Sequence, residues 1–465
     1  MQRQERWGIV GGGFLGMTLA LRLAQQGKAV TLFEAAPSLG GLASAWQLGD
    51  VVWDRHYHVT LSSDRYLRSL LKELGLENEI RWGTTQTGLY ADSKLYSLSN
   101  TFEFLKFPTL SLVDKVRLGA TIFYASRIKD GKKLEKVSVI EWLEKLSGRN
   151  VTARLWLPLL RAKLGESYRE TSAAFIWASI ARMYAARRGG MKKEMFGYVS
   201  NGYARIIQRF AEALQRAGVH LRLGQAVGSV SSTQSGGVRV GLGNGTREVF
   251  DQVVVTAAAP VASRICTHLT ADEISQLNRI KYQGIICASL LLKRPLSSFY
   301  ITNITDPGVP YTAVIEMTAL VPREHFGGRS LVYLPKYVES DAPEFKLTDE
   351  QVQDSFLYAL LQMYPHCSRE NVLCFQISRV KYLLPVPTLN YSEGLPDVST
   401  SIPGVYIVNS AHILNGTLNV NETIQLAEIA AQRFAVPRPG RNLLLDTADH
   451  EIREDNCQPL AGSRQ

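Results

Sequence analysis

The sequence contains few cysteines. Five occur among 465 residues, no two of them form a Cys-x-x-Cys pair, and their number is odd. A sparse, odd set suits a reducing compartment better than a disulfide framework, and the ligand spacing of a zinc site is missing. We therefore expect a cytoplasmic protein without a metal site. The cysteines are Cys266, Cys287, Cys367, Cys374 and Cys457.

Long hydrophobic runs are also missing. No stretch of about 18 or more apolar residues, the length that spans a bilayer, occurs in the chain. Near the start, the apolar segment Trp7–Leu21 contains three consecutive glycines and no clean cleavage site follows it, so it is not expected to be a signal peptide. The chain is predicted not to span a membrane, while peripheral contact with a membrane surface stays open.

Internal repeats, low-complexity tracts and motifs for nucleic acid binding are absent as well. The chain carries 52 Lys and Arg against 42 Asp and Glu, a net charge of +10. This balance favours anionic ligands or anionic lipid. The basic residues are scattered, however, and no helix-turn-helix or RNP-like pattern accompanies them, so we expect no nucleic acid partner. The length and the 45% hydrophobic content suit roughly two or three domains with buried cores.

A glycine-rich turn lies between a predicted strand and a predicted helix. Trp7–Val10 is a short apolar run typical of a strand, Phe14–Gln26 has helical spacing of leucines, and Ala29–Phe33 is rich in β-formers. This order predicts a βαβ unit. The spacing Gly-x-Gly-x-x-Gly between its first strand and its helix is typical of a dinucleotide-binding site.

Each residue of this turn has a predicted role. Gly11 permits a tight turn, Gly13 lets the backbone approach a pyrophosphate, and Gly16 lets the helix lie close to the sheet. The helix N-terminus, at Phe14 and Leu15, is then expected to face the phosphates. The alternative, a glycine-rich turn without a ligand, fits the surrounding elements less well.

Glu34 ends the second predicted strand, 23 residues after Gly11. Its carboxylate can accept hydrogen bonds from a ribose diol and repels a 2′-phosphate, which disfavours NADP and leaves NAD and FAD open. Gly40, Gly41 and Leu42 follow at once. A second glycine pair would bring more backbone N–H groups to the phosphates or to the flavin side of a cofactor.

Two later regions continue the α/β pattern. We predict an α/β fold in which a Rossmann-like domain, with a parallel sheet flanked by helices, is interleaved with an α+β substrate domain. The first domain takes residues 1–60, 198–260 and 392–436, the second takes 61–197 and 261–391, and 437–465 form a loosely ordered tail. Later elements of the first domain are predicted as helices over Ile206–Ala217 and Asn421–Phe434 and strands over Val219–Leu223, Val227–Val230, Val238–Val240, Val253–Thr256 and Val405–Val408.

The segments Gly11–Gly16, Glu34 and Leu39–Ser44 together resemble the FAD-binding start of one superfamily. It comprises amine oxidases, protoporphyrinogen oxidases, phytoene desaturases and UDP-galactopyranose mutases, and the likeness extends to about Phe434. The resemblance implies FAD as the cofactor of the Rossmann-like domain. It also implies that the Gly40–Leu42 segment lies against the cofactor and that Val227 contacts its adenine end.

A C-terminal part of the resemblance covers Gly404–Ser410 and Gly416–Glu422. It implies a helix N-terminus aimed at the flavin pyrimidine, where it would stabilise negative charge on the reduced ring. Turn and N-cap chemistry explains the same asparagines without a ligand. The pair Asn409-Ser410 departs from the Gly-Glu of many amine oxidases, and no cysteine is found where some members attach flavin, so FAD is expected to be non-covalent. The residues implied to contact FAD here are Thr417, Asn419 and Asn421.

Candidate catalytic residues lie in a polar and aromatic segment, Asp54–His58, which resembles its counterpart in the mutase-like members. His58, with Tyr57 beside it, can exchange a proton near neutral pH. The alternative is a strand with His56 and His58 on one face and Tyr57 on the other. Tyr382 is a further candidate, since its segment resembles the aromatic strand along the other side of the flavin.

Two basic candidates, Arg161 and Lys163, lie in a segment that resembles part of the substrate domain. Guanidinium and ammonium groups suit a carboxylate or phosphate, so an anionic substrate group is one expectation. The later basic run Arg187–Lys193 is interpreted as a solvated helix face. The region Phe102–Ile128 mixes large apolar and basic residues; related proteins use it to touch membrane, whereas a core helix with a few exposed basic positions is the preferred interpretation.

Three functions follow. The favoured one is an FAD-dependent oxidoreductase that transfers hydride between an organic substrate and flavin. A mutase or isomerase that uses reduced FAD on a nucleotide-sugar-like substrate is the alternative, and a non-enzymatic nucleotide-binding module is the third. The expected partner is a small molecule, lipophilic or anionic; the oligomeric state stays open.

Overall fold

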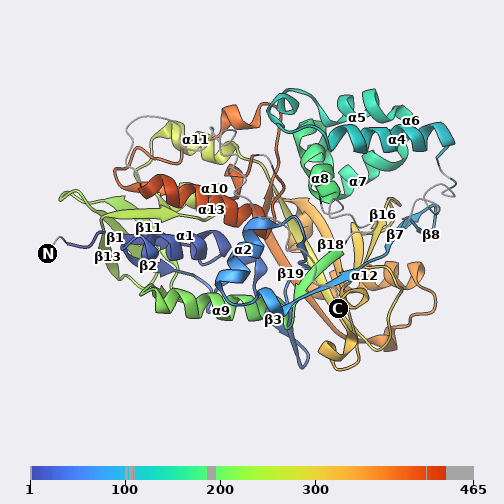
Figure 1. Ribbon diagram of the computed structural model, residues 1–465, viewed down its shortest axis with the longest axis horizontal. Coiled ribbons are helices and arrows are strands. Elements are labelled where there is room, and N and C mark those ends of the chain that lie inside the picture. Colours follow the sequence, from blue (N-terminus) through green and yellow to red (C-terminus); the bar gives the residue numbers. More distant parts are fainter. Residues whose placement is uncertain are drawn as a thin grey trace, which may run out of the picture.

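The computed structural model describes residues 3–99, 103, 108, 110–185, 195–414 and 416–435. Figure 1 shows their arrangement: one α/β half, and a second half in which a group of helices lies above a large sheet. The interpretations given for Cys457, for Arg187–Lys193 and for the tail at 437–465 concern positions outside the described residues.

A five-stranded sheet organises the α/β half, in the order β10-β2-β1-β14-β20, and every neighbouring pair is parallel. Its strands come from three separate regions of the chain, and the sheet confirms the predicted α/β class; the domain boundaries stay a prediction. The strands are β1 (Arg6–Val10), β2 (Ala29–Phe33), β10 (His220–Arg222), β14 (Gln252–Val255) and β20 (Val405–Ile407).

Both faces of this sheet are buried, as expected for a parallel sheet covered on both sides. Side chains alternate along β1, so that Ile9 packs with the helices on one face and Val10 with the elements on the other. The first face is covered by α1 (Phe14–Gln25), α2 (Arg65–Glu73), α9 (Gly202–Arg216) and α13 (Val420–Ala435). The second is covered by β11 (Val227–Ser232), β12 (Val238–Leu242) and β13 (Arg247–Phe250), which form an antiparallel sheet, and by α10 (Ala259–Ile265) and α11 (Ala271–Arg279).

A seven-stranded sheet forms the lower part of the other half, in the order β19-β15-β18-β17-β16-β7-β8. Its strands are antiparallel except for the β16–β7 pair, and α12 (Asp349–Met363) packs against it. The strands are β7 (Thr87–Ala91), β8 (Lys94–Ser97), β15 (Tyr282–Leu292), β16 (Ile301–Ile304), β17 (Ala313–Glu316), β18 (Ser330–Glu339) and β19 (Val372–Pro385).

Two small sheets contact this part of the molecule. The hairpin of β3 (Ala45–Leu48) and β4 (Val51–Asp54) leads directly into the predicted catalytic segment. The other sheet has the order β5-β9-β6, from β5 (Thr60–Leu61), β6 (Ile80–Thr84) and β9 (Met195–Val199). Both pack into one core with β15, β17 and β18.

Helices gather above the large sheet (Figure 1). They share a core that contains the indole rings of Trp142, Trp156 and Trp177. A π-helical turn, Thr152–Trp156, leads into the helix that carries Arg161 and Lys163. The helices are α4 (Leu112–Ala125), α5 (Val139–Ser147), α6 (Arg149–Val151), α7 (Leu157–Leu164) and α8 (Ala173–Ala185).

Helix α4 buries only one of its faces. Leu118, Thr121 and Ala125 are buried, whereas large apolar residues cover the outer face together with Arg117. The interpretation of this region as a core helix holds for the inner face of α4, where Leu118 and Ala125 join a hydrophobic core. It does not hold for the outer face, which exposes large apolar residues as well as basic ones. The exposed apolar residues of α4 are Leu112, Val113, Val116, Phe123 and Tyr124, each more than half exposed. None of the described helices has the length and apolarity needed to cross a membrane.

Arg22 joins three helices that cover the parallel sheet. Its guanidinium, on α1, lies 2.8 Å from the carboxylate of Glu73 on α2 and 2.7 Å from that of Glu428 on α13. The arginine side chain is only 18% exposed, so this cation keeps two acidic groups together in a partly desolvated position.

Replacing this cation should destabilise the fold. In Arg22→Met, Glu73 and Glu428 would repel each other without a counter-ion, and we expect a loss of about 1–3 kcal/mol in the free energy of unfolding. Urea denaturation at neutral pH measures this loss of stability. Arg169→Met is the matched control, because the Arg169–Glu166 pair is 64% exposed on both sides and should change stability by less than about 0.5 kcal/mol. Equal losses in the two variants would contradict the prediction.

Candidate active site

The predicted glycine turn connects β1 to α1, and within it the backbone of the helix lies very close to that of the strand end. Gly11 has a φ of +115°, a conformation that favours glycine. A Cβ on Gly16 would lie 1.9 Å from the carbonyl oxygen of Gly11. Helix α1 therefore packs against the strand end at a distance that excludes any side chain at position 16, which is the role predicted for this glycine.

The N-terminus of α1 has no side-chain cap. Gly13 is its N-cap residue and has no side chain to accept hydrogen bonds from the first backbone N–H groups, while Phe14 and Leu15 line a cavity. Free N–H groups at a helix N-terminus, with the positive end of the helix dipole, form a binding site for a phosphate or another anion.

The second glycine pair lies against the first turn. The N–H of Gly40 donates to the carbonyl of Gly12 at 2.9 Å, and a Cβ on Gly41 would lie 3.1 Å from the Cα of Gly13. Gly40 and Gly41 both have positive φ. Two segments that are separate in the sequence, one around Gly13 and one around Gly40, thus form one surface of bare backbone beside the α1 N-terminus.

Glu34 is held at the end of β2. Its carboxylate accepts hydrogen bonds from the N–H of Gly12 at 2.6 Å and from that of Ala36 at 2.8 Å. The N–H of Gln225 donates to the Glu34 carbonyl at 2.9 Å, which brings the segment before Val227 to this strand end. Glu34 and Val227 lie outside the lining of the cavity described next, so their expected contacts with ribose and adenine stay predictions.

A cavity of about 500 Å³ begins at these glycines and extends between the two halves of the molecule. This volume is in the range of small-molecule and cofactor sites. Four of the predicted site residues do not line this cavity: Gly16, Glu34, Arg161 and Val227. Those that do are Gly11, Gly13, Phe14, Leu15, Gly40, Gly41, Leu42, Tyr57, His58, Lys163, Tyr382, Thr417, Asn419 and Asn421.

These features fit a dinucleotide cofactor. Side chains at Gly13 and Gly41 would fill the space where two backbones approach, and an uncapped helix faces it. No cysteine is found among the described lining residues, and the described residues contain no group of three or more His, Cys, Asp or Glu placed to hold a metal ion.

The asparagines near the start of α13 make hydrogen bonds within the protein. Asn419 Oδ1 accepts from the N–H of Glu422 at 3.1 Å, as an N-cap does, and its Nδ2 donates to the carbonyl of Thr417. Asn421 Oδ1 accepts from the N–H groups of Tyr66 and Leu67, at 2.9 and 3.2 Å, and so caps α2 from α13. Both asparagines line the cavity, but capping is the role that their side-chain contacts show.

The segment after β4 is irregular, so the alternative interpretation as a strand with alternating faces is wrong. His56, Tyr57 and His58 all line the cavity. His58 Nδ1 lies 2.9 Å from the carbonyl of His56, and His56 Nδ1 lies 3.1 Å from that of Leu42. A carbonyl oxygen only accepts hydrogen bonds, so each Nδ1 carries the proton and each Nε2 has a free lone pair.

Burial keeps both imidazoles neutral. It lowers the pKa of His58 to about 3 and that of His56 to about 4. His58 also packs on the ring of Tyr203, with ring centroids 4.8 Å apart. At neutral pH both rings are therefore neutral, with Nε2 as the unprotonated nitrogen, and have no imidazolium proton to give.

Tyrosines also line the cavity, among them Tyr57, Tyr337 and Tyr382. Tyr57 and Tyr337 share a hydrogen bond between their hydroxyl groups at 2.9 Å, and burial raises the pKa of both. Tyr382, on β19, packs edge-on against Tyr282. The hydroxyl groups of Tyr57 and Tyr337 therefore stay protonated at neutral pH and can donate hydrogen bonds.

The two basic candidates point in different directions. Arg161 is exposed, lies 3.9 Å from Glu166, and stacks on Tyr168 outside the cavity. Lys163 lines the cavity, with its Nζ over the rings of Phe175 and Tyr337 at 5.8 and 5.7 Å. An active-site role predicted for Arg161 is therefore not supported by its position, whereas Lys163 is placed for one.

Several lining residues were not predicted. Arg182 and Asp64 form an ion pair at 3.1 Å across the cavity wall, and Asp64 also accepts from the N–H of Leu61. The two residues are 118 positions apart in the sequence, so no local sequence pattern predicts the pair. Tyr203 and Tyr337 were missed for the same reason, whereas His56 was visible inside the Asp54–His58 segment.

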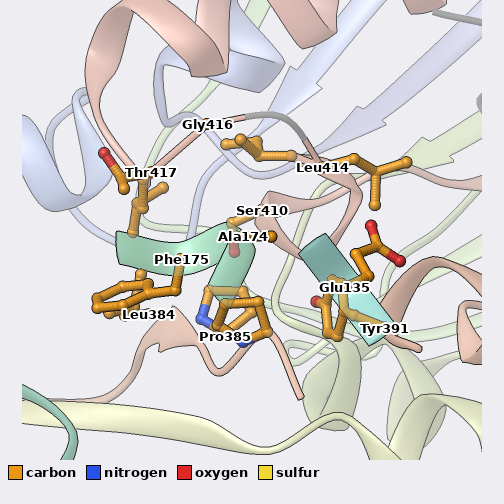
Figure 2. Close-up of a pocket in the computed structure, with 13 residues that line it drawn as sticks. Glu135, Ala174, Phe175, Leu384, Pro385, Tyr391, Ser410, Leu414, Gly416 and Thr417 are labelled. Atoms are coloured by element: carbon orange, nitrogen blue, oxygen red, sulfur yellow. The ribbon is translucent and has the colours of Figure 1, made fainter. Parts of the chain in front are cut away.

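A smaller pocket adjoins the main cavity and is shown in Figure 2. Its carboxylate, Glu135, accepts hydrogen bonds from the N–H and hydroxyl groups of Ser392 at 3.0 and 2.6 Å. The remaining surface is mostly apolar. The residues that it shares with the main cavity are Leu384, Ser410, Ile413, Thr417 and Leu418.

One protein family matches most of the chain. The family model for flavin containing amine oxidoreductase covers residues 16–434. A 15-cis-phytoene desaturase of Synechococcus elongatus is 23% identical over 46% of this chain and 48% of that protein. A coproporphyrinogen III oxidase of Staphylococcus aureus is 23% identical over 53% of this chain and 59% of that protein. The chain thus spans about half the length of the curated relatives it matches.

Solved structures share the fold over nearly the whole chain. A putative protoporphyrinogen oxidase from Exiguobacterium sp. 255-15 superposes with a TM-score of 0.74 at 17% identity, covering 94% of this chain and 99% of that one. A reduced UDP-galactopyranose mutase superposes with a TM-score of 0.70 at 13% identity, covering 96% of each. At such identities the likeness shows the fold alone, and it agrees with the resemblance predicted from the sequence.

Asp54 anchors the histidine segment and should make stability depend on pH. Its buried carboxyl group accepts from the N–H of Tyr203 at 2.7 Å, and burial raises its pKa from 3.8 to about 8. A carboxyl group whose pKa is raised by folding contributes fully below its unfolded pKa, and the contribution is lost as pH rises through its folded pKa. Between about pH 5 and pH 8, the wild-type free energy of unfolding should therefore fall more than that of Asp54→Asn, which keeps an acceptor for Tyr203. Urea denaturation at both pH values measures the difference; parallel pH profiles would refute it.

Proposed function

The chain belongs to the family of flavin-containing amine oxidoreductases, and from this we propose that it is an FAD-dependent oxidoreductase acting on an organic small molecule. The observation that carries the proposal is the continuity of one cavity. It starts at the bare backbone of Gly13 and Gly41 and ends among Tyr57, Lys163 and Tyr382. The proposed nucleotide site and the proposed substrate space would therefore be parts of one cavity.

Non-covalent FAD fits the first part of the cavity. The uncapped N-terminus of α1, with Gly13, Gly40 and Gly41, would hold the pyrophosphate, and Glu34 would accept from the ribose diol. The N-terminus of α13 would face the flavin end. When bound, the flavin would supply the capacity to exchange hydride with the substrate.

His58 is the proposed proton acceptor for this exchange. Its Nδ1–H is directed to the His56 carbonyl, which leaves the unprotonated Nε2, at the cavity, to take a proton. Tyr57 and Tyr382 would orient the substrate through hydroxyl donors and ring contacts.

A mutase that uses reduced FAD is the second candidate. It is favoured by the placement of His56, Tyr57 and His58 together at the cavity and by the fold likeness to UDP-galactopyranose mutase. A nucleotide sugar carries a diphosphate, however, and among the described lining residues only Lys163 is a cation without an acidic partner. The oxidoreductase therefore has better support. A non-enzymatic nucleotide module would not need the substrate-sized part of the cavity.

Flavin content and redox behaviour test the proposal. The purified protein should be yellow and release FAD on denaturation, and a candidate substrate should bleach the flavin band under anaerobic conditions, as hydride transfer requires. His58→Ala should keep its FAD and reduce the flavin at least about tenfold more slowly. Product formed only by pre-reduced enzyme, with no net change in flavin absorbance, would support the mutase instead; a protein that takes up no FAD would refute both.

We further propose that α4 contacts a membrane surface. Its outer face exposes Leu112, Val116 and Phe123 beside Arg117 and Arg127, and its acidic residue, Asp114, is buried. An apolar helix face with basic neighbours suits insertion at the surface of anionic lipid. This location, like the cytoplasmic one expected from the cysteine pattern, stays a prediction.

Co-sedimentation with vesicles tests this contact. The protein should bind phosphatidylglycerol vesicles more strongly than phosphatidylcholine vesicles, and replacing Leu112, Val116 and Phe123 by Ser should weaken binding about tenfold or more, because apolar area no longer inserts. A matched triple variant removes exposed apolar residues elsewhere: Tyr358→Ser, Leu373→Ser and Leu389→Ser. If both triple variants bind as the wild type does, or the wild type binds neither vesicle, the membrane contact is ruled out.

A further inference from the structure

The charged residues of the cavity are paired, with one exception. Arg182 and Asp64 form an ion pair, and both oxygens of Asp64 lie within 3.2 Å of the guanidinium. His56 and His58 are neutral because of burial. Among the lining residues that the structure describes, Lys163 is the remaining charged group.

Lys163 has no acidic partner and no hydrogen-bond acceptor among the described residues. Its Nζ lies between the rings of Phe175 and Tyr337, 5.8 and 5.7 Å from their centroids. Aromatic faces attract a cation without neutralising it. Burial, reinforced by the charge of Arg182, lowers the pKa of Lys163, as expected for an ammonium group that lacks a counter-ion.

A hydroxyl donor lies beside this ammonium group. Tyr337 contributes one of the rings under Lys163, and its hydroxyl shares a hydrogen bond with that of Tyr57. One proton lies between the two oxygens, so the second hydroxyl proton is free to be donated elsewhere. An ammonium group and a phenol hydroxyl at the same end of a cavity form a donor set for an anion.

From this arrangement we propose that the substrate carries a carboxylate, bound by Lys163 and by the Tyr57–Tyr337 pair, on an apolar body. The inference rests on the proposed function, because it specifies the substrate class of that cavity. A carboxylate supplies one negative charge to one unpaired cation, whereas a phosphate dianion would need further donors. The apolar body would contact Ile285, Leu383, Leu384, Ile413 and Leu418.

The same geometry disfavours a free amine as substrate. An alkylammonium group would meet the like charge of Lys163, and the carboxylate of Asp64 is already engaged by Arg182 and by the N–H of Leu61. Desolvating a cation without a counter-ion is costly. The family description names amine oxidoreduction, and the proposed carboxylate would set the substrate of this chain apart from an amine.

Matched probes test the preference. Calorimetric titration of the FAD-loaded protein with 4-phenylbutyrate, 4-phenylbutylamine and 4-phenylbutanol varies the head group on one apolar body. We expect the carboxylate to bind at least about tenfold more tightly than the amine, and Lys163→Met to lose at least about tenfold in carboxylate affinity while alcohol binding stays the same. Arg161→Met, two residues away on α7 but outside the cavity, should bind all three probes as the wild type does.

The titration also separates this inference from the proposed function. FAD content is read from the absorbance of the same samples, so loss of the cofactor site is recognised independently of probe binding. Lys163→Gln serves as a second variant if Lys163→Met does not fold. Equal affinity for carboxylate and amine, wild-type carboxylate affinity in the Lys163 variants, or no probe binding by yellow protein would overturn the carboxylate assignment.

Discussion

Backbone contact between glycines is the constraint on which the cavity depends. Helix α1 approaches β1 so closely that the Gly11 carbonyl occupies the place of a side chain at Gly16, and the Gly40–Gly41 segment then packs on Gly13. These contacts fix where the uncapped α1 N-terminus lies and leave room for a ligand beside it. A capped helix is more stable by about 1 kcal/mol. The absence of a cap at α1 therefore costs some stability and leaves free N–H donors at the cavity.

Local signals in the sequence predicted this part of the molecule well. The elements β1, α1 and β2 follow from apolar periodicity and a turn whose geometry requires glycine, and all of the residues involved are close in sequence. Lys163 and Arg161 show what the local sequence could not predict. They are two positions apart on α7, and about 100° of rotation per residue places them on different sides of the helix. Which side faces a cavity depends on β18 and α8, which the local sequence does not specify.

Longer-range contacts explain the other differences. The alternation of Asp54–His58 suggested a strand, but hydrogen bonds to the Leu42 carbonyl and to the start of α9 hold the segment in an irregular path. The Arg182–Asp64 pair joins α8 to the turn before α2 and has no sequence signature. Because Arg182 and Asp64 offset each other's charge, Lys163 is the unpaired charge among the described lining residues of the cavity. An unpaired charge in a desolvated space contributes more to the local electric field than several exposed charges would.

The capping of α2 by Asn421 has a consequence for biosynthesis. The acceptor for the Tyr66 and Leu67 N–H groups lies more than 350 residues later in the chain, and the fifth strand of the parallel sheet, β20, is also among the last elements. The parallel sheet and the helices that cover it are therefore complete only after α13 has been synthesised. Until then, the glycine turn near the N-terminus has been synthesised, but the later segments that complete the cavity wall have not. Apolar helices made early in the chain, such as α1, therefore lack their late packing partners while the later segments are being synthesised, a stage at which protein chains are prone to aggregate.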